Sequence, residues 1–201
     1  MRKTFDFHRE FAYPIVFGAL WGAWELSLGS LLHLSHFPFK GVLLASGAVV
    51  IALVGKSFAR ERWSILKMGV IAAFLRILAP GGVILSPMIA IVVEALILES
   101  VIMALSKNPL SYSIAGAITF IWPPIHRLIF QGLIFGKEIY MLYVNLIDKG
   151  IRALGVNLTP PLLVTSFLIF LMAIGFLVGL LAWTIGENTR RRLGWSEGIP
   201  G

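Results

Sequence analysis

Apolar residues gather into six long runs, which are separated by short segments rich in charged residues, glycine or proline. A helix that spans a bilayer needs ~20 mainly apolar residues at a rise of about 1.5 Å each. The third run is short and contains Lys67 and Arg76. We predict an all-α integral membrane protein, with residues 1–201 forming one domain of six spanning helices. These are expected at about residues 11–32, 41–58, 65–79, 83–105, 110–135 and 161–185.

Composition supports a membrane protein, because 58% of the 201 residues are hydrophobic, 13% are charged and the mean hydropathy is +0.88. The chain has no cysteine, which excludes disulfides, cysteine nucleophiles and cysteine metal ligands. Its net charge of +7 is spread over termini and loops and does not form a basic stripe with interleaved aromatic residues. We therefore expect no nucleic-acid partner.

The basic residues predict the orientation of the chain, because cytoplasmic loops are enriched in lysine and arginine. With six spans, the basic N-terminus, the 56–67 segment, Lys107 and the 190–192 cluster all fall on one side. Both termini are therefore expected in the cytoplasm.

The 137–160 connection is expected to form an amphipathic helix outside the membrane, lying across the bundle. Ile139, Leu142, Leu146 and Ile147 recur there at near-helical spacing. The helix would serve either as a lid or only as a structural element.

Small and large residues are segregated around the first predicted helix at 100° per residue. Small residues let membrane helices approach closely, so two small stripes imply two neighbours. The glycine stripe is expected to pack inside the chain, because it also carries a carboxylate. The second stripe would either bind a separate membrane protein or pack within the chain. The stripes are Gly18, Gly22, Glu25 and Gly29, and Ala19, Ala23, Ser27 and Ser30.

Ionisable residues within the spans indicate a functional site, because an unpaired charge at the bilayer centre costs about 3 kcal/mol. Groups from four helices are expected to line one outward-facing substrate cavity. Structural ion pairs, Glu25 with Arg76 or Glu94 with Arg127, are the alternative. Glu99 lies ~140° around its helix from Glu94 and is expected to have another partner. The predicted substrate-binding residues are Glu25, Arg76, Glu94, His126 and Arg127.

Two proline-containing segments are expected to interrupt the helices. Pro123 and Pro124 remove two backbone donors, so the fifth helix should kink or open near Thr119. Such breaks at membrane depth often border binding sites. The segment APGGVILSP between the third and fourth helices is expected to turn and fold back over the site.

Motifs of known enzymes are weak in this chain. Gly55, Lys56 and Ser57 resemble the end of a phosphate-binding loop, but Val50 stands where the first glycine belongs and no strand precedes it. His33 and His36 lack the HExxH pattern, so no metal site is expected. An intramembrane hydrolase would have to combine Ser86 or Ser100 with His126.

The six spans, cytoplasmic termini, small-residue first helix and charged outer cavity resemble the substrate-binding S component of energy-coupling factor (ECF) transporters. The resemblance implies a binding subunit, not an enzyme, without a cofactor, in a prokaryotic plasma membrane. It would capture a vitamin-like micronutrient and dock through Ala19 and Ala23 on a transmembrane T component driven by two ATPases. His8 does not match the cobalt and nickel members, which favours an organic solute. An intramembrane enzyme or a stand-alone carrier is the alternative.

Overall fold

The computed structural model describes residues 2–34, 40–59, 61–78, 85–155 and 159–194, with side chains except those of residues 2–11, 30, 33, 34, 153 and 154. Every regular element in these ranges is helical. In chain order the elements are α1 (Arg2–Leu34), α2 (Lys40–Phe58), α3 (Ser64–Leu75), a 3-10 turn η1 (Arg76–Leu78), α4 (Leu85–Leu105), α5 (Pro109–Thr119), α6 (Trp122–Phe135), α7 (Glu138–Leu154) and α8 (Pro160–Arg192).

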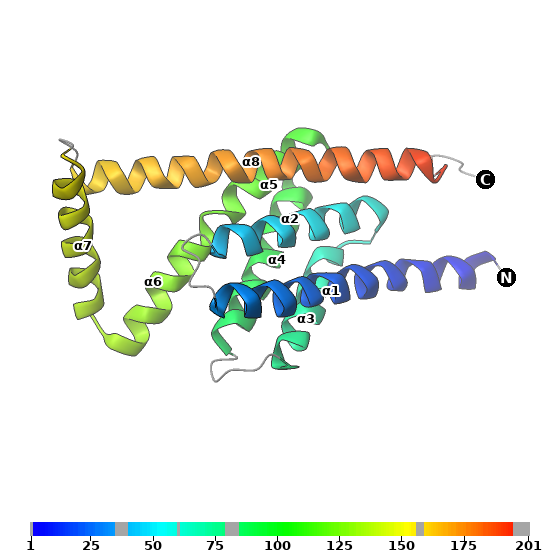
Figure 1. Cartoon of the computed structure of the whole chain (residues 1–201). Helices are drawn as coiled ribbons and strands as arrows, with labels where there is room; N and C mark the ends of the chain where they lie inside the picture. Colours follow the sequence, from blue (N-terminus) through cyan, green and yellow to red (C-terminus); the bar gives the residue numbers. More distant parts are fainter. Residues whose placement is uncertain (1, 35–39, 60, 79–84, 156–158, 195–201) are drawn as a thin grey trace.

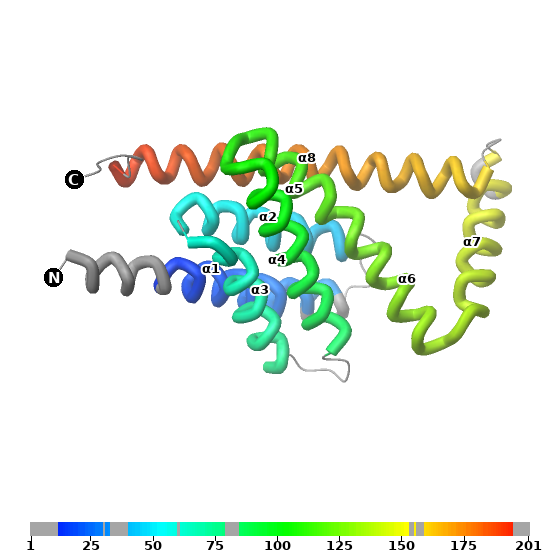
Figure 2. Tube along the Cα trace, turned by 180° about the vertical axis from the view of Figure 1, so that it is seen from behind, coloured from blue at the N-terminus to red at the C-terminus, as the bar shows by residue number. Residues whose placement is uncertain are grey.

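The helices form an elongated bundle in which α1, α2 and α8 run side by side along its length (Figure 1). Seen from behind, α3 and α4 lie across α1 and α2, and α6 leads away from the bundle to α7 (Figure 2). The start of α1 and the end of α8 lie at one end of the molecule, which we call the termini end, and α7 lies at the opposite end, the α7 end.

Four segments of the described chain are long and apolar enough to cross a membrane: α2, α4, α5 together with α6, and α8. These segments confirm a multi-pass helical membrane protein. The two remaining predicted spans, in α1 and α3, stay predictions. α3 has 12 residues, about 18 Å of helix, which is less than the ~30 Å of hydrocarbon.

The predicted break in the fifth helix is present, because α5 ends at Thr119 and α6 begins at Trp122. Pro123 and Pro124 occupy the first turn of α6, where a missing backbone N–H costs nothing. The APGGVILSP segment lies mostly in residues 79–84, outside the described residues.

The backbones of α5 and α8 approach each other closely through glycines that the sequence analysis did not single out. A Cβ at Gly116 would lie 2.2 Å from the backbone oxygen of Gly175, and one at Gly179 would lie 2.1 Å from that of Tyr112. Gly175 and Gly179 form a GxxxG pattern, the usual signal for close backbone approach in membranes. That pattern could have predicted the contact.

The predicted amphipathic helix is present as α7, but it stands away from the bundle (Figure 1). Among the described elements its main contacts are with α6 and α8, so it does not cover the bundle as expected. Leu142 and Leu146, on its apolar face, are each more than half exposed. α7 is therefore not closed over a site in this structure.

Candidate functional site

The glycine stripe of α1 packs inside the chain, as predicted, because its partner is α3. A Cβ at Gly18 would lie 2.9 Å from Ile71 Cβ, and one at Gly22 would lie 2.6 Å from Leu75 Cδ1. Side chains on this stripe would separate the two helices. The stripe is therefore occupied by an internal contact and has no room for a partner protein.

The neighbouring stripe of α1 faces outward. Ala19, Ala23 and Ser27 are exposed, while Gly18 and Gly22 beside them are buried. Ala23 and Ser27 also form one wall of an apolar groove of about 590 Å³, whose other walls come from α2 and α8. The described part of the chain thus leaves the second small stripe uncovered.

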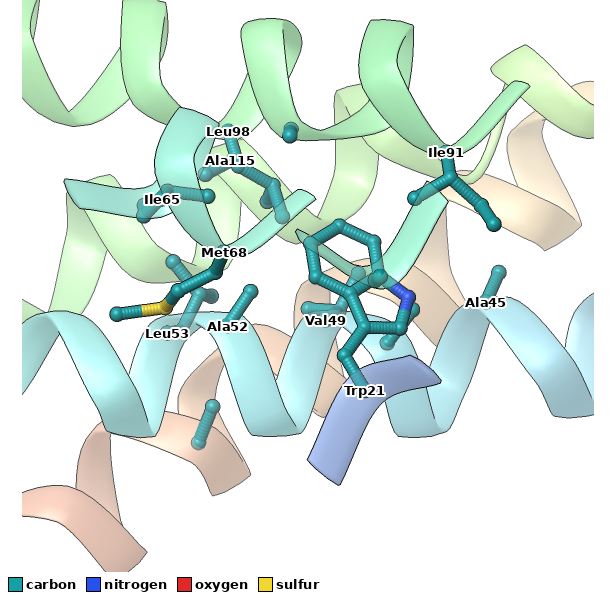
Figure 3. Close-up of a cluster of buried hydrophobic side chains, with 14 of the residues drawn as sticks. Trp21, Ala45, Val49, Ala52, Leu53, Ile65, Met68, Ile91, Leu98 and Ala115 are labelled. Carbon is teal, nitrogen blue, oxygen red and sulfur yellow. The ribbon is translucent and has the colours of Figure 1, made fainter. Parts of the chain in front are cut away.

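Trp21 is a core residue of α1, and Glu25 follows it one helical turn later. Its ring is buried between α2 and α4, close to Ala45, Val49 and Ile91 (Figure 3). The indole interacts with the carboxyl group of Glu25, one turn further along α1. Its N–H forms no hydrogen bond of normal geometry within the described chain.

Two carboxyl groups meet beside this tryptophan. Glu25 of α1 and Glu94 of α4 are 8% and 7% exposed, and the two groups are close enough to interact electrostatically. Neither forms an ion pair with a described side chain. Buried carboxylates normally have such partners, so the acidic pair differs from an ordinary buried charge in the described part of the chain.

Arg76 joins the acidic pair from η1. Its Nη1 donates a hydrogen bond to the backbone oxygen of Glu25 at 2.9 Å, and its charge acts on the Glu25 carboxyl group. The guanidinium lies over Gly29, where a Cβ would be 3.1 Å from Nη1. Arg76 is thus held by the α1 backbone, and the Glu25–Arg76 ion pair, which the sequence offered as the alternative to a ligand cavity, is not formed.

The two remaining predicted site residues lie apart from the acidic pair. His126 of α6 lies between Trp122 and Phe130 and interacts with the backbone of Ser86, two turns before Glu94, or about 12 Å along α4. Its Nε2 is buried without a partner among the described residues. Arg127 is exposed and forms no ion pair with Glu94. The structure thus brings together three of the five residues.

The hydrolase alternative gains no support from this geometry. His126 contacts the backbone of Ser86, and Ser100 lies 14 residues further along α4. Within the described residues, no three histidine, aspartate or glutamate side chains gather as a metal site would require. The side chains of His8, His33 and His36 lie outside the described residues.

A second buried charge pair, nearer the termini end, is saturated by protein partners. Lys56 Nζ lies 2.7 Å from Glu99 Oε1 and also donates to Ser64 Oγ and the Glu61 backbone oxygen. Glu99 accepts backbone N–H bonds from Trp63 and Ile65 at the start of α3. Glu99 therefore has partners other than the acidic pair, as expected. Lys56, which would contact a nucleotide phosphate in a phosphate-binding loop, is instead paired with the Glu99 carboxylate.

The fold and the buried charges define the class: a multi-pass, all-helical membrane protein with an acidic pair inside its bundle. The chain matches no protein-family model, and no curated protein or solved structure is significantly similar to it. Its function is therefore inferred from its own residues.

Proposed function

We propose that this chain is the substrate-binding S component of an ECF-type importer, which captures a small organic micronutrient and docks on a T component energised by two ATPases. The proposal includes six spans, cytoplasmic termini and a prokaryotic plasma membrane. It rests chiefly on the division of α1 into a glycine face packed on α3 and an exposed face of small residues.

The exposed face of α1 suits contact with another membrane protein. In lipid, helices associate through close van der Waals packing, which small side chains permit. Ala19 and Ala23 are one turn apart and exposed, and the groove beside Ala23 could accept a larger side chain from a partner helix. A surface that only faced lipid would have no need of such small residues.

The acidic pair suits a substrate site. Glu25, Glu94 and Trp21 N–H have more hydrogen-bonding capacity than the surrounding described protein uses. Polar groups buried in this state usually serve a ligand. In this proposal the solute contacts Glu25 and Glu94, Arg76 fixes the α1 side of the site, and His126 and Arg127 lie toward its entrance.

Docking is tested with a bulky residue on the exposed face of α1. Ala23→Leu should abolish co-purification with the T component and ATPases, because the added side chain prevents close helix approach. The chain should remain folded, since Ala23 faces outward. Ala173→Leu, on an exposed part of α8, is the matched control and should leave the complex intact. Complexes of equal yield from both variants would exclude α1 as the docking surface.

The alternative functions have distinct outcomes. A stand-alone carrier would move solute into liposomes that contain only this chain. An intramembrane enzyme would turn over its substrate without nucleotide and would lose activity in His126→Ala. Either result would contradict the S-component proposal.

A further inference from the structure

Helix α7 connects the ends of two segments that are long and apolar enough to cross a membrane. One of these segments is α5 together with α6, and the other is α8. Gly136 and Lys137 alone separate α6 from α7, and residues 155–159 separate α7 from α8. Five residues reach at most about 18 Å. Because both connections are short, α7 lies close to the membrane surface at which the two segments end.

The direction of α7 suits a helix that lies along this surface. It runs crosswise to α8 at the α7 end of the molecule (Figures 1 and 2). The chain changes direction at Gly136, whose φ of 71° is in the left-handed region that favours glycine. If α8 crosses the bilayer, α7 extends along the membrane plane for about 25 Å, the length of its 17 residues.

The sequence of α7 is divided into a polar face and an apolar face. At 100° per residue, its charged residues and Asn145 share an arc of ~100°. The opposite arc, ~160° wide, carries no charge. Such a division is typical of helices that lie in the membrane interface. The polar arc contains Glu138, Asn145, Asp148, Lys149 and Arg152, and the apolar arc contains Ile139, Tyr140, Tyr143, Val144, Leu146, Ile147 and Ile151.

Two tyrosines on the apolar face fix the rotation of α7 about its axis. Tyr143 OH donates a hydrogen bond to Gln131 Oε1 of α6. Tyr140 OH lies against Gly132, where a Cβ would collide with it. Both contacts lie about one turn before the end of α6, on its membrane side. The apolar face of α7 therefore turns toward the membrane, and the charged face turns toward water.

The described part of the chain leaves much of this apolar face uncovered. Val144 and Leu146, on its two flanks, are each more than half exposed. Exposed apolar side chains continue onto the adjoining ends of the membrane segments, at Phe135 of α6 and Leu162 of α8. One apolar surface thus extends from α6 across α7 to α8. Lipid is the expected neighbour of α6 and α8, and the same neighbour suits the face of α7 between them.

We propose that α7 is an interfacial helix, whose apolar face lies at the boundary between lipid headgroups and acyl chains. Tyrosine is enriched at this depth of the bilayer. The polar arc contains two acidic and two basic residues, so α7 needs no anionic lipid. The helix would anchor the end of α6 and the start of α8 at one membrane surface. The inference does not depend on the transporter assignment, because α7 is separate from the acidic pair and from α1.

Spin-label accessibility in phosphatidylcholine liposomes tests this proposal, because the chain has no cysteine and can be labelled at one introduced cysteine at a time. Leu146→Cys places the label on the apolar face, and Asn145→Cys places it on the polar face one residue away; both positions are exposed. Oxygen, which concentrates in lipid, should relax the label at Leu146 more than a water-soluble nickel chelate does. The reverse is expected at Asn145. Ile169→Cys, at an exposed position within the apolar run of α8, is the reference for hydrocarbon and should show the strongest preference for oxygen.

Three results would overturn the proposal. A preference for the nickel chelate at both positions of α7 would show that the helix stands in water. Few collisions of the Leu146 label with either reagent would show that protein covers the apolar face, either the bundle or a second copy of the chain. A label at Leu146 with the same preference as one at Ile169 would place α7 within the hydrocarbon and not at its surface.

Discussion

At the residue scale, two buried charge clusters that look alike in the sequence have different surroundings. Lys56 and Glu99 satisfy each other and the first turn of α3. Glu25 and Glu94 meet without an ion-pair partner in the described chain. The first cluster is therefore structural, whereas the second is the site that we propose for the solute.

Replacing one member of the saturated pair should destabilise the protein. Lys56→Met leaves Glu99 as an uncompensated buried charge, which should cost about 3–5 kcal/mol of unfolding free energy. The measurement is thermal unfolding in detergent. Lys67→Met removes a lysine from a partly exposed pair with Glu61 and should cost ~1 kcal/mol or less. Similar losses in the two variants would contradict a structural role for the buried pair.

The sequence predicted which groups are buried better than it predicted their partners. Glu25, Arg76 and Glu94 come together because each must avoid lipid and all lie on inward faces of their helices. Arg127 differs because α6 packs so loosely that none of its described residues is buried. An exposed arginine can reach water, so its position in an apolar run did not require an internal partner.

At the element scale, the segregation of small residues on α1 correctly predicted that its glycine face packs inside the chain. The structure adds that the partner of this face is α3. The α5–α8 contact went unnoticed, although Gly175 and Gly179 have the same spacing. In both contacts the backbone of one helix comes within side-chain distance of the other.

The α5–α8 contact should be the least tolerant of added volume. Gly179→Ala would place a methyl group 2.1 Å from the Tyr112 backbone oxygen, so the helices must separate. We expect a loss of roughly 1–3 kcal/mol in detergent unfolding. Gly150→Ala in α7 meets nothing within 4 Å and should be neutral or stabilising by about 0.5–1 kcal/mol. Equal stability of the two variants would exclude tight α5–α8 packing.

At the scale of the whole molecule, the sequence predicted the helical membrane class but not the position of α7. Hydrophobic runs indicate membrane helices because apolar length is a local property, but α1 and α8 extend beyond the apolar runs that predicted them. The position of α7 depends on contacts at both of its ends, which amphipathic spacing does not specify. Its exposed apolar face lies beyond the bundle and not over it.

The proposed orientation can be tested because the chain has no cysteine of its own. A single cysteine at Lys149, in α7, should react with an impermeant maleimide in intact cells. One at Arg192, at the termini end, should react only after permeabilisation. Both positions are exposed, so reactivity reports their side of the membrane. Labelling of both positions in intact cells would contradict an arrangement with α7 outside and the termini inside.

The central claim is that the acidic pair binds the solute whereas the exposed face of α1 does not. Mass spectrometry of small molecules released on denaturation tests it most directly. Wild type and Ala23→Leu should release the same solute in equal amounts. Glu94→Gln should lose it, because a charged hydrogen bond contributes about 1.5–3 kcal/mol, or at least ten-fold in affinity. Equal release from a folded Glu94→Gln variant, or no release from wild type, would contradict the account.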